Sequence, residues 1–224
     1  MPRTRRQPQQ STPVANNGNG VSQYVKLENR LLLLAWLNSL LGFEHNRDLL
    51  ADIKEAEEGF DSSGRSFIYQ RLVSRGSKVK ISADILASYD DNIRKHLTEM
   101  NRRRPVPVTL RYFQYLAALY AEIFLDYYFN RPAELLAGLN DFVAARNAAR
   151  LPVESQDEKF NEDDVGKLAF WMATGSGKTL IMHLNYRQFL HYNNTPLDNI
   201  LLVTPNEGLS EQHLEELAAS GIPA

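Results

Sequence analysis

Cysteine is absent from the 224-residue sequence. Its absence excludes disulfide bonds, thiolate metal sites and cysteine nucleophiles, and it fits a reducing compartment. A basic excess is absent too, because 25 Lys and Arg stand against 27 Asp and Glu, which gives a formal net charge of -2. Any contact with nucleic acid must therefore come from a local patch and not from the charge of the whole chain.

Long hydrophobic runs are also scarce. The longest one, LLLLAWLNSLLGF at residues 31–43, is shorter than the roughly 20 apolar residues that cross a bilayer, and Asn38 and Ser39 interrupt it. The arginines of the N-terminal MPRTRRQPQQ are followed by polar residues, where an export signal needs an apolar stretch. We therefore expect a buried helix at residues 31–43 and a cytoplasmic protein.

Composition divides the chain into parts. Residues 1–20 are rich in Pro, Gln, Asn and Gly, which predicts a disordered tail. Across residues 21–150, leucines and aromatic residues recur every three or four positions, and this spacing predicts an all-helical N-terminal domain. The charged, proline-bearing segment 151–164, LPVESQDEKFNEDD, reads as a linker.

The pattern changes at residues 165–224. KLAFWMA is an apolar run of strand length, and a glycine turn and the helical pattern TLIMHLNYRQFLHY follow it; NILLVTP and LSEQHLEELAAS repeat the alternation. Strand, loop, helix, strand and helix in this order are typical of an open parallel sheet. We therefore expect an α/β fold here, the beginning of a lobe built on a parallel sheet.

The segment ATGSGKT, between the expected strand and helix, has the composition of a phosphate cradle. Backbone N–H groups close on phosphate oxygens only where no side chain intervenes, which Gly175 and Gly177 allow. Lys178 would reach the β and γ phosphates of a nucleotide, Thr179 would coordinate magnesium, and the helix N-terminus would add its positive dipole end. The strict pattern G-x-x-x-x-G-K-[ST] has glycine where this chain has Met172. The alternative is a chance glycine turn. The predicted phosphate-binding residues are Thr174, Gly175, Ser176, Gly177, Lys178 and Thr179.

Together, ATGSGKT and the later LLVTPNEGLSEQHLEEL at residues 201–217 resemble motifs I and Ia of the superfamily two helicases. The resemblance is most specific to the Res subunits of type III restriction-modification enzymes and the DEAD/DEAH-box proteins grouped with them. It implies a RecA-like P-loop NTPase lobe, ATP and Mg²⁺ as cofactors, and catalytic roles for Lys178 and Thr179. It also implies that the second segment touches the DNA backbone. The residues that it nominates for DNA binding are Thr204, Pro205, Asn206, Ser210 and Gln212.

A further resemblance concerns LRYFQYLAALYAE at residues 110–122, because the family often carries an arginine-aromatic-glutamine segment ahead of motif I that holds the adenine. The resemblance assigns this role to Gln114. The separation from Lys178 is longer than is common in helicases, so residues 130–165 form an insertion or Gln114 has no adenine role. The alternative interpretation of residues 112–129 is an aromatic helix packed in a core.

The acid that phosphoryl transfer requires is missing from the expected place. Such an acid normally lies in a D-E-x-x string on a strand after motif I. Asp90 and Asp91 precede the cradle, and Asp163 and Asp164 precede the strand, so we interpret all four as solvated or helix-start acids. No D-E-x-x string and no second RecA-like lobe follow within the 224 residues. We therefore expect that this chain alone is inactive in ATP hydrolysis.

These observations predict the N-terminal part of an ATP-dependent DNA helicase or translocase of the type III restriction-subunit kind. It would serve restriction or phage defence, with duplex DNA and a methyltransferase (modification) subunit as partners. An alternative is a non-enzymatic interaction module that docks a restriction or methyltransferase partner. A small-molecule kinase is disfavoured by TPNEGLSEQH. The run RRRPVP at residues 102–107 either contacts phosphates or forms a solvated turn, and the five histidines show no metal-ligand spacing.

Overall fold

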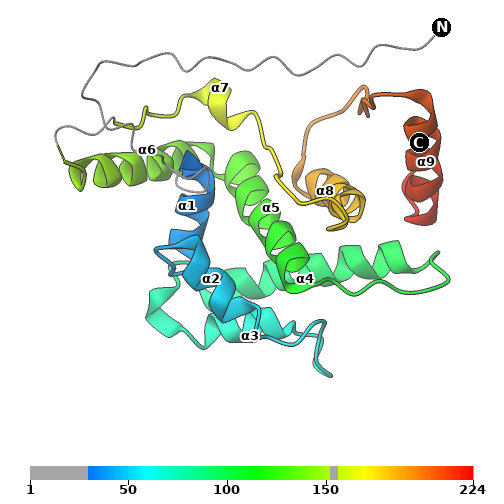
Figure 1. The fold of residues 1–224 in the computed structure, drawn as a ribbon, viewed down its shortest axis with the longest axis horizontal. Coiled ribbons are helices and arrows are strands. Elements are labelled where there is room, and N and C mark those ends of the chain that lie inside the picture. The colour runs from blue at the N-terminus through cyan, green and yellow to red at the C-terminus, as the bar shows by residue number, and fades with distance from the viewer. Residues whose placement is uncertain (1–29, 152–155, 224) are drawn as a thin grey trace, which may run out of the picture.

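The computed structural model describes residues 30–151 and 156–223. The tail predicted at residues 1–20 lies outside them, and so does part of the predicted linker. The described residues form helices joined by turns and extended segments (Figure 1). In chain order, the elements are α1 (Leu32–Leu40), α2 (Asn46–Ile53), α3 (Phe67–Val73), the short 3-10 helix η2 (Gly76–Lys78), α4 (Ala83–Asn101), α5 (Tyr112–Asn130), α6 (Pro132–Ala148), α7 (Glu162–Val165), α8 (Lys178–Tyr192) and α9 (Glu207–Ala219).

Local signals explain where several helices begin. The hydroxyl of Ser66 accepts a hydrogen bond from the Tyr69 N–H at the start of α3, and Ser82 caps α4 in the same way. Pro132 opens α6, where its missing N–H costs nothing. The helical periodicity in the sequence is thus confirmed for these elements.

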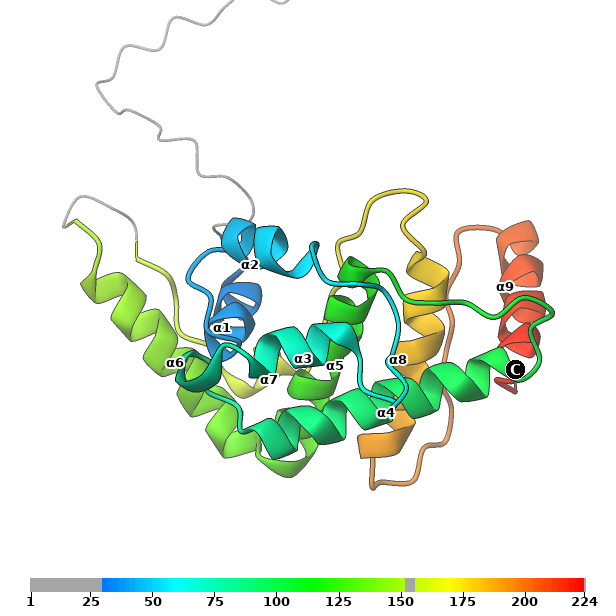
Figure 2. The same cartoon turned by 90° about the horizontal axis from the view of Figure 1, so that it is seen from below.

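The core is built around α5. Its side chains Leu116, Leu119 and Ile123 are buried in one cluster with residues from α1 to α6. Leu184 and Tyr192 of α8 belong to the same cluster, and α8 lies beside α5 and α4 in both ribbon views (Figures 1 and 2). The helix that follows the glycine loop is therefore held by the N-terminal helices. Whether the chain divides into domains at the predicted boundaries stays a prediction.

The predicted parallel sheet is wrong. In the part of the chain that the structure describes there is no strand, and the single isolated bridge joins Phe60 and Ser66. The two expected strands, residues 167–173 and 199–205, are extended connections on either side of α8 (Figure 1). A strand exists only when a neighbour takes up its N–H and C=O groups, and neither run has such a neighbour. An apolar run in the sequence predicts burial or pairing without showing where its partner lies.

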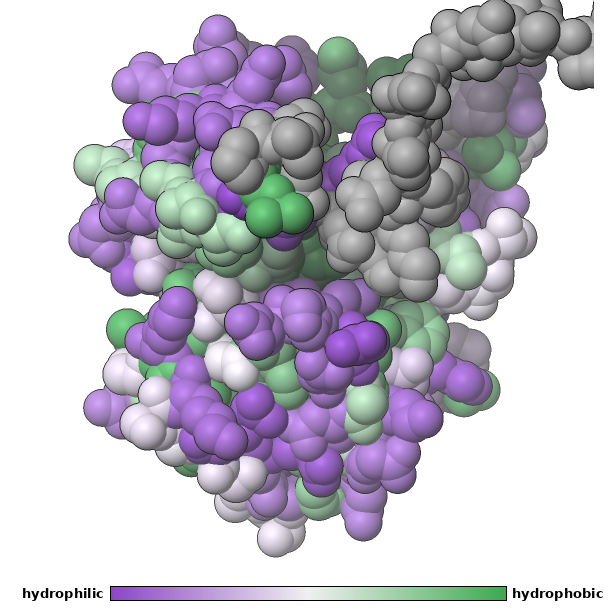
Figure 3. Space-filling view, turned by 60° about the vertical axis from the view of Figure 1, so that its left-hand side comes forward, coloured by the Kyte–Doolittle hydropathy of each residue, from purple (hydrophilic) through white to green (hydrophobic). Residues whose placement is uncertain are grey.

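Exposed apolar side chains concentrate on these extended segments. Trp171, Leu201 and Val203 are 87%, 84% and 88% exposed. By contrast, hydrophilic side chains prevail over the lower half of the molecule in the view of Figure 3. The segment at residues 167–173 also covers a cavity of about 770 Å³, which it lines together with side chains of α1 and α5. Among the described residues, no helix is both long and apolar enough to span a membrane.

Candidate functional site

The loop that connects residues 167–173 to α8 has a backbone that requires glycine at two positions. Gly175 has a φ of +76° and Gly177 a φ of +84°, in the left-handed region that other residues rarely adopt. At Gly177 a Cβ atom would also lie 2.5 Å from the side-chain Nε2 of Gln114, whereas at Gly175 it would meet open space. Met172 shows no positive φ, so this conformation does not require glycine there.

Helix α8 begins immediately after this loop with a free N-terminal turn. Gly177 is its N-cap and offers no side chain to the helix. A helix leaves its first four N–H groups without partners inside the helix, and a side-chain cap normally satisfies some of them. Here those donors and the positive end of the helix dipole remain available to an anion.

Lys178 and Thr179 occupy the first turn of α8. The ammonium group of Lys178 reaches back over the loop and donates to the carbonyl oxygen of Ala173 at 3.0 Å. Ser176 closes the same turn, because its N–H and its hydroxyl both donate to that carbonyl. A phosphate would replace a neutral carbonyl with anionic oxygens as the partner of Lys178. The residues present therefore fit the phosphates of a nucleotide.

Gln114 lies against the loop although 62 residues separate it from Ser176. It stands in the first turn of α5, where its Oε1 accepts from the Arg111 N–H at 2.9 Å. Its Nε2 donates to the carbonyl oxygen of Ser176, also at 2.9 Å. The structure thus brings the predicted glutamine to the predicted loop. Its contact with adenine stays a prediction.

The residues predicted to bind DNA gather at the start of α9. Asn206 is the N-cap and accepts from the Leu209 N–H at 2.9 Å. The hydroxyls of Thr204 and Ser210 are in contact, and that of Thr204 donates to the Asn206 carbonyl oxygen at 3.1 Å. Pro205 lies between Thr204 and Asn206 in the sequence. We call Thr204, Asn206 and Ser210 the α9 cap cluster. The cluster presents small polar groups at a helix N-terminus.

Gln212 stands apart from the α9 cap cluster. It lies within the helix and donates from Nε2 to Glu216 at 3.0 Å. Three exposed glutamates, Glu207, Glu211 and Glu215, follow one another at four-residue spacing along α9. These carboxylates would repel phosphate along this face, and Glu207, in the first turn of α9, places one of them beside the α9 cap cluster.

The other end of α9 is fastened to α8. The hydroxyl of Ser220 lies 2.8 Å from Nδ1 of His183 and accepts from Arg104 at 2.7 Å. Arg187 donates to the Ser220 carbonyl oxygen at 2.8 Å. Burial lowers the pKa of His183 to about 4, so this imidazole is neutral near pH 7. The arginine run at residues 102–104 thus supplies a structural contact through Arg104.

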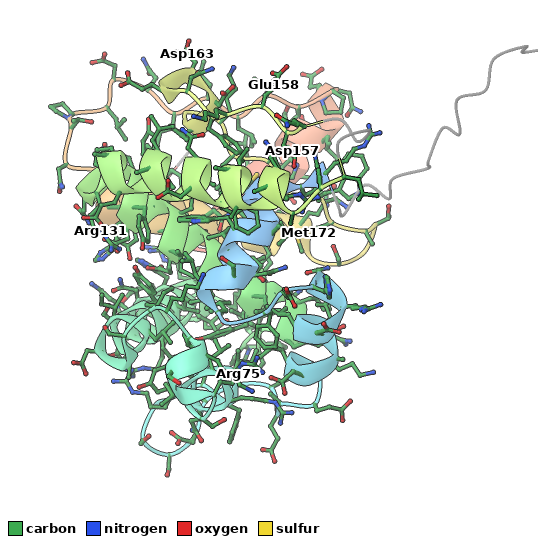
Figure 4. The ribbon with its side chains drawn as sticks, turned by 90° about the vertical axis from the view of Figure 1, so that its left-hand side faces the viewer. Arg75, Arg131, Asp157, Glu158, Asp163 and Met172 are labelled. Carbon is green, nitrogen blue, oxygen red and sulfur yellow. The ribbon has the colours of Figure 1, made fainter. Side chains whose placement is uncertain are left out.

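None of the acids considered for magnesium is hydrogen-bonded to the loop. Asp90 is buried in the interior of α4 and accepts from the Ser66 N–H at 3.1 Å and from the Tyr115 hydroxyl, so the interpretation of Asp90 as a solvated or helix-start acid is wrong. Asp163 and Asp164 lie in the first turn of α7, which confirms them as helix-start acids. Asp163 is at the outer edge of the molecule, well separated from Met172, which leads into the loop (Figure 4). No group of three His, Asp or Glu residues suited to a metal ion occurs in the described residues.

Sequence reasoning also missed the buried acid Glu122 of α5. Its side chain is fully buried and accepts from Gln188 at 2.8 Å, from the Tyr192 hydroxyl at 2.6 Å and from Asn92 at 3.3 Å. Burial raises the pKa of Glu122 to about 7, although these hydrogen bonds lower it. The only signal in the sequence is a pair of acids, Glu122 and Asp126, four residues apart on a helix that is otherwise largely apolar.

A glycine loop with two left-handed residues, a lysine and an uncapped helix N-terminus together offer the donors that phosphate-binding loops use. Residues 139–222 match the family model described as type III restriction enzyme, res subunit. The match covers less than half of the chain and includes both motifs. The resemblance to this helicase-like family is therefore confirmed for that segment. Comparisons with curated proteins and with solved structures found no match.

Proposed function

We propose that this chain binds ATP with Mg²⁺ through its glycine loop and duplex DNA through the α9 cap cluster. In this proposal it is the N-terminal part of an ATP-dependent helicase or translocase of the type III restriction-subunit kind. The observation that carries the proposal is the loop itself. Gly175 and Gly177 adopt the backbone that a phosphate cradle needs, and Lys178 lies across it.

The bound nucleotide would supply the phosphoryl group and Mg²⁺ the charge that stabilises its transfer. Lys178 would hold the terminal phosphates, and Thr179 would contribute its hydroxyl to the metal. The first-turn N–H groups of α8 would orient the phosphate chain. Since no D-E-x-x string follows the loop in the sequence, we expect binding without steady hydrolysis from this chain alone.

A nucleotide titration tests the proposal. Trp171 is exposed and lies two residues before the loop, whereas Trp36 is buried, so Trp36→Phe leaves a single reporter near the site. We expect Mg-ATP to change the Trp171 fluorescence with saturation. Lys178→Ala should weaken binding by about tenfold or more, because it removes a charge-assisted contact to phosphate.

The matched control is Lys80→Ala, which removes the same charge at an exposed lysine before α4. It should leave the titration unchanged. Equal affinity of the Lys178→Ala and unaltered chains would exclude the loop as the phosphate site.

A second candidate function is a non-enzymatic interaction module, favoured by the exposed apolar side chains at residues 171, 201 and 203. Its partner would be a restriction or methyltransferase subunit. Partner capture that persists in Lys178→Ala, together with no nucleotide binding by the unaltered chain, would favour this module over the motor.

A further inference from the structure

Polar contacts join α5 to α8 and to the glycine loop before it at two positions along α5. At the first position, Gln114 of α5 donates to the carbonyl of Ser176 in the glycine loop. At the second position, about two turns further along α5, Glu122 accepts from Gln188 and Tyr192 of α8. The second position lies in the fully buried core.

Packing of apolar side chains alone leaves a helix some freedom to slide or rotate on its neighbour. Buried hydrogen bonds are directional and costly to leave unmade, so they select one register. Gln188 strengthens this selection because its Nε2 donates both to Glu122 and to the Ala118 carbonyl oxygen, at 2.8 and 2.9 Å. A shift of α8 by one residue, about 1.5 Å, would break these contacts.

The loop moves with α8 because the helix begins at Lys178, directly after Gly177. A displacement of α8 along α5 would carry Ser176 away from Gln114 and change how the first-turn N–H groups and Lys178 face a phosphate. The space beside Gly177 is too small to absorb such a movement, because Gln114 already fills it.

We propose that Glu122 is a positioning residue for the glycine loop. Its carboxyl group holds α8 on α5 in the register at which the loop binds nucleotide phosphates. This inference rests on the proposed nucleotide binding, and its tests are chosen so that the two can fail separately. Glu122 touches no nucleotide and acts through Gln188 and Tyr192.

The test replaces the three residues that join α5 to α8 by apolar groups of similar shape, in the triple variant Glu122→Leu, Gln188→Leu, Tyr192→Phe; Asn92 keeps His191 as a partner. Removing all partners together leaves few buried polar groups unpaired, so stability should change little. The register, however, loses its directional contacts. We expect a fold with unchanged helical content whose affinity for Mg-ATP is weaker by about tenfold or more, because small misplacements at a reactive site are costly.

Three comparisons separate positioning from general damage. Glu122→Gln keeps an acceptor oxygen for Tyr192 but places a donor where Gln188 donates, so its affinity should lie between those of the unaltered chain and the triple variant. Leu184→Met changes apolar packing in the α8 face of the same core without touching the network, and should also retain affinity. Tyr192→Phe alone removes one donor to Glu122 and, if the triple variant does not fold, serves as the milder perturbation, with an expected loss of about threefold.

Hydrogen exchange of the amides at residues 173–181 without nucleotide gives a second readout. The triple variant should exchange faster in this segment than both the unaltered chain and Glu122→Gln. If the unaltered chain fails to bind Mg-ATP, the proposed function fails while this exchange measurement still decides the positioning role. A folded triple variant with unchanged affinity and unchanged loop exchange would overturn the inference.

Discussion

Replacing Glu122 by glutamine should change how the stability of this protein depends on pH. The carboxyl group is fully buried, and burial raises its pKa to about 7 from an ordinary value of 4.5. The folded state therefore favours the protonated carboxyl more than the unfolded state does. Stability from this group is present below about pH 4.5 and is lost as the pH rises through about 7.

The magnitude follows from the same two pKa values. Their difference corresponds to about 3 kcal/mol at 1.36 kcal/mol per unit of pKa. Because the carboxyl group is not exposed, solvent screening does not reduce this value, and we take it as the upper bound. Glutamine has the same shape and never ionises. Relative to the unaltered chain, Glu122→Gln should thus be similar in stability near pH 4.5 and up to about 3 kcal/mol more stable above about pH 8.

The assay is urea unfolding followed by far-ultraviolet circular dichroism, repeated across this pH range. His96 and His183 act in the opposite direction, because burial lowers the pKa of each to about 4 and their contribution is lost as the pH falls below about 6.5. The difference between Glu122→Gln and the unaltered chain cancels these histidines. Glu215→Gln, the same change at an exposed glutamate of α9, is the matched control. A difference that stays constant from pH 4.5 to 8 would refute the reasoning.

Two further comparisons of variants test the glycine loop and the α9 cap cluster. Gly177→Ala should lower the free energy of unfolding by about 1–2 kcal/mol more than Gly175→Ala. Both variants carry the strain of a left-handed alanine, but only the alanine at residue 177 also collides with Gln114. Equal losses of stability in urea unfolding would contradict this close approach. The pair Asn206→Ala and Ser210→Ala should weaken the binding of a labelled DNA duplex, measured by fluorescence anisotropy, by about tenfold. Gln212→Ala should have a smaller effect, because the Gln212 side chain is hydrogen-bonded to Glu216. A larger effect of Gln212→Ala would show that DNA contacts the face of α9 and not its N-terminus.

Local features of the structure were predictable from the sequence. The period of leucines and aromatic residues identifies α4 and α5 because a helix satisfies its own backbone, whatever surrounds it. The left-handed turn before α8 follows from the glycines at residues 175 and 177, because glycine has no Cβ and adopts a positive φ without strain. The contact between Gln114 and the loop was accessible only through the resemblance to the helicases, since nothing in the spacing of 62 residues indicates it.

The sheet and the buried acid show why the rest was not predictable. A strand depends on another segment for its hydrogen bonds, so the runs at residues 167–173 and 199–205 resemble strands in composition while the fold leaves them unpaired. Glu122 presents the converse case. In the sequence it is one of two acids, with Asp126, on an aromatic helix, and its partners Asn92, Gln188 and Tyr192 come from two other helices.

The two predicted binding regions, the glycine loop and the α9 cap cluster, lie apart in the structure. Ser220, at the end of α9, is fastened to His183 and Arg187 of α8, close behind the glycine loop. The α9 cap cluster lies at the opposite end of a helix of 13 residues, about 20 Å away. The contacts of Ser220 with His183 and Arg187 therefore connect α8, which begins at the glycine loop, to α9, which carries the α9 cap cluster at its other end. Because the cluster and the loop are joined through these contacts and not through a shared surface, substitutions in one region should leave ligand binding at the other measurable by itself.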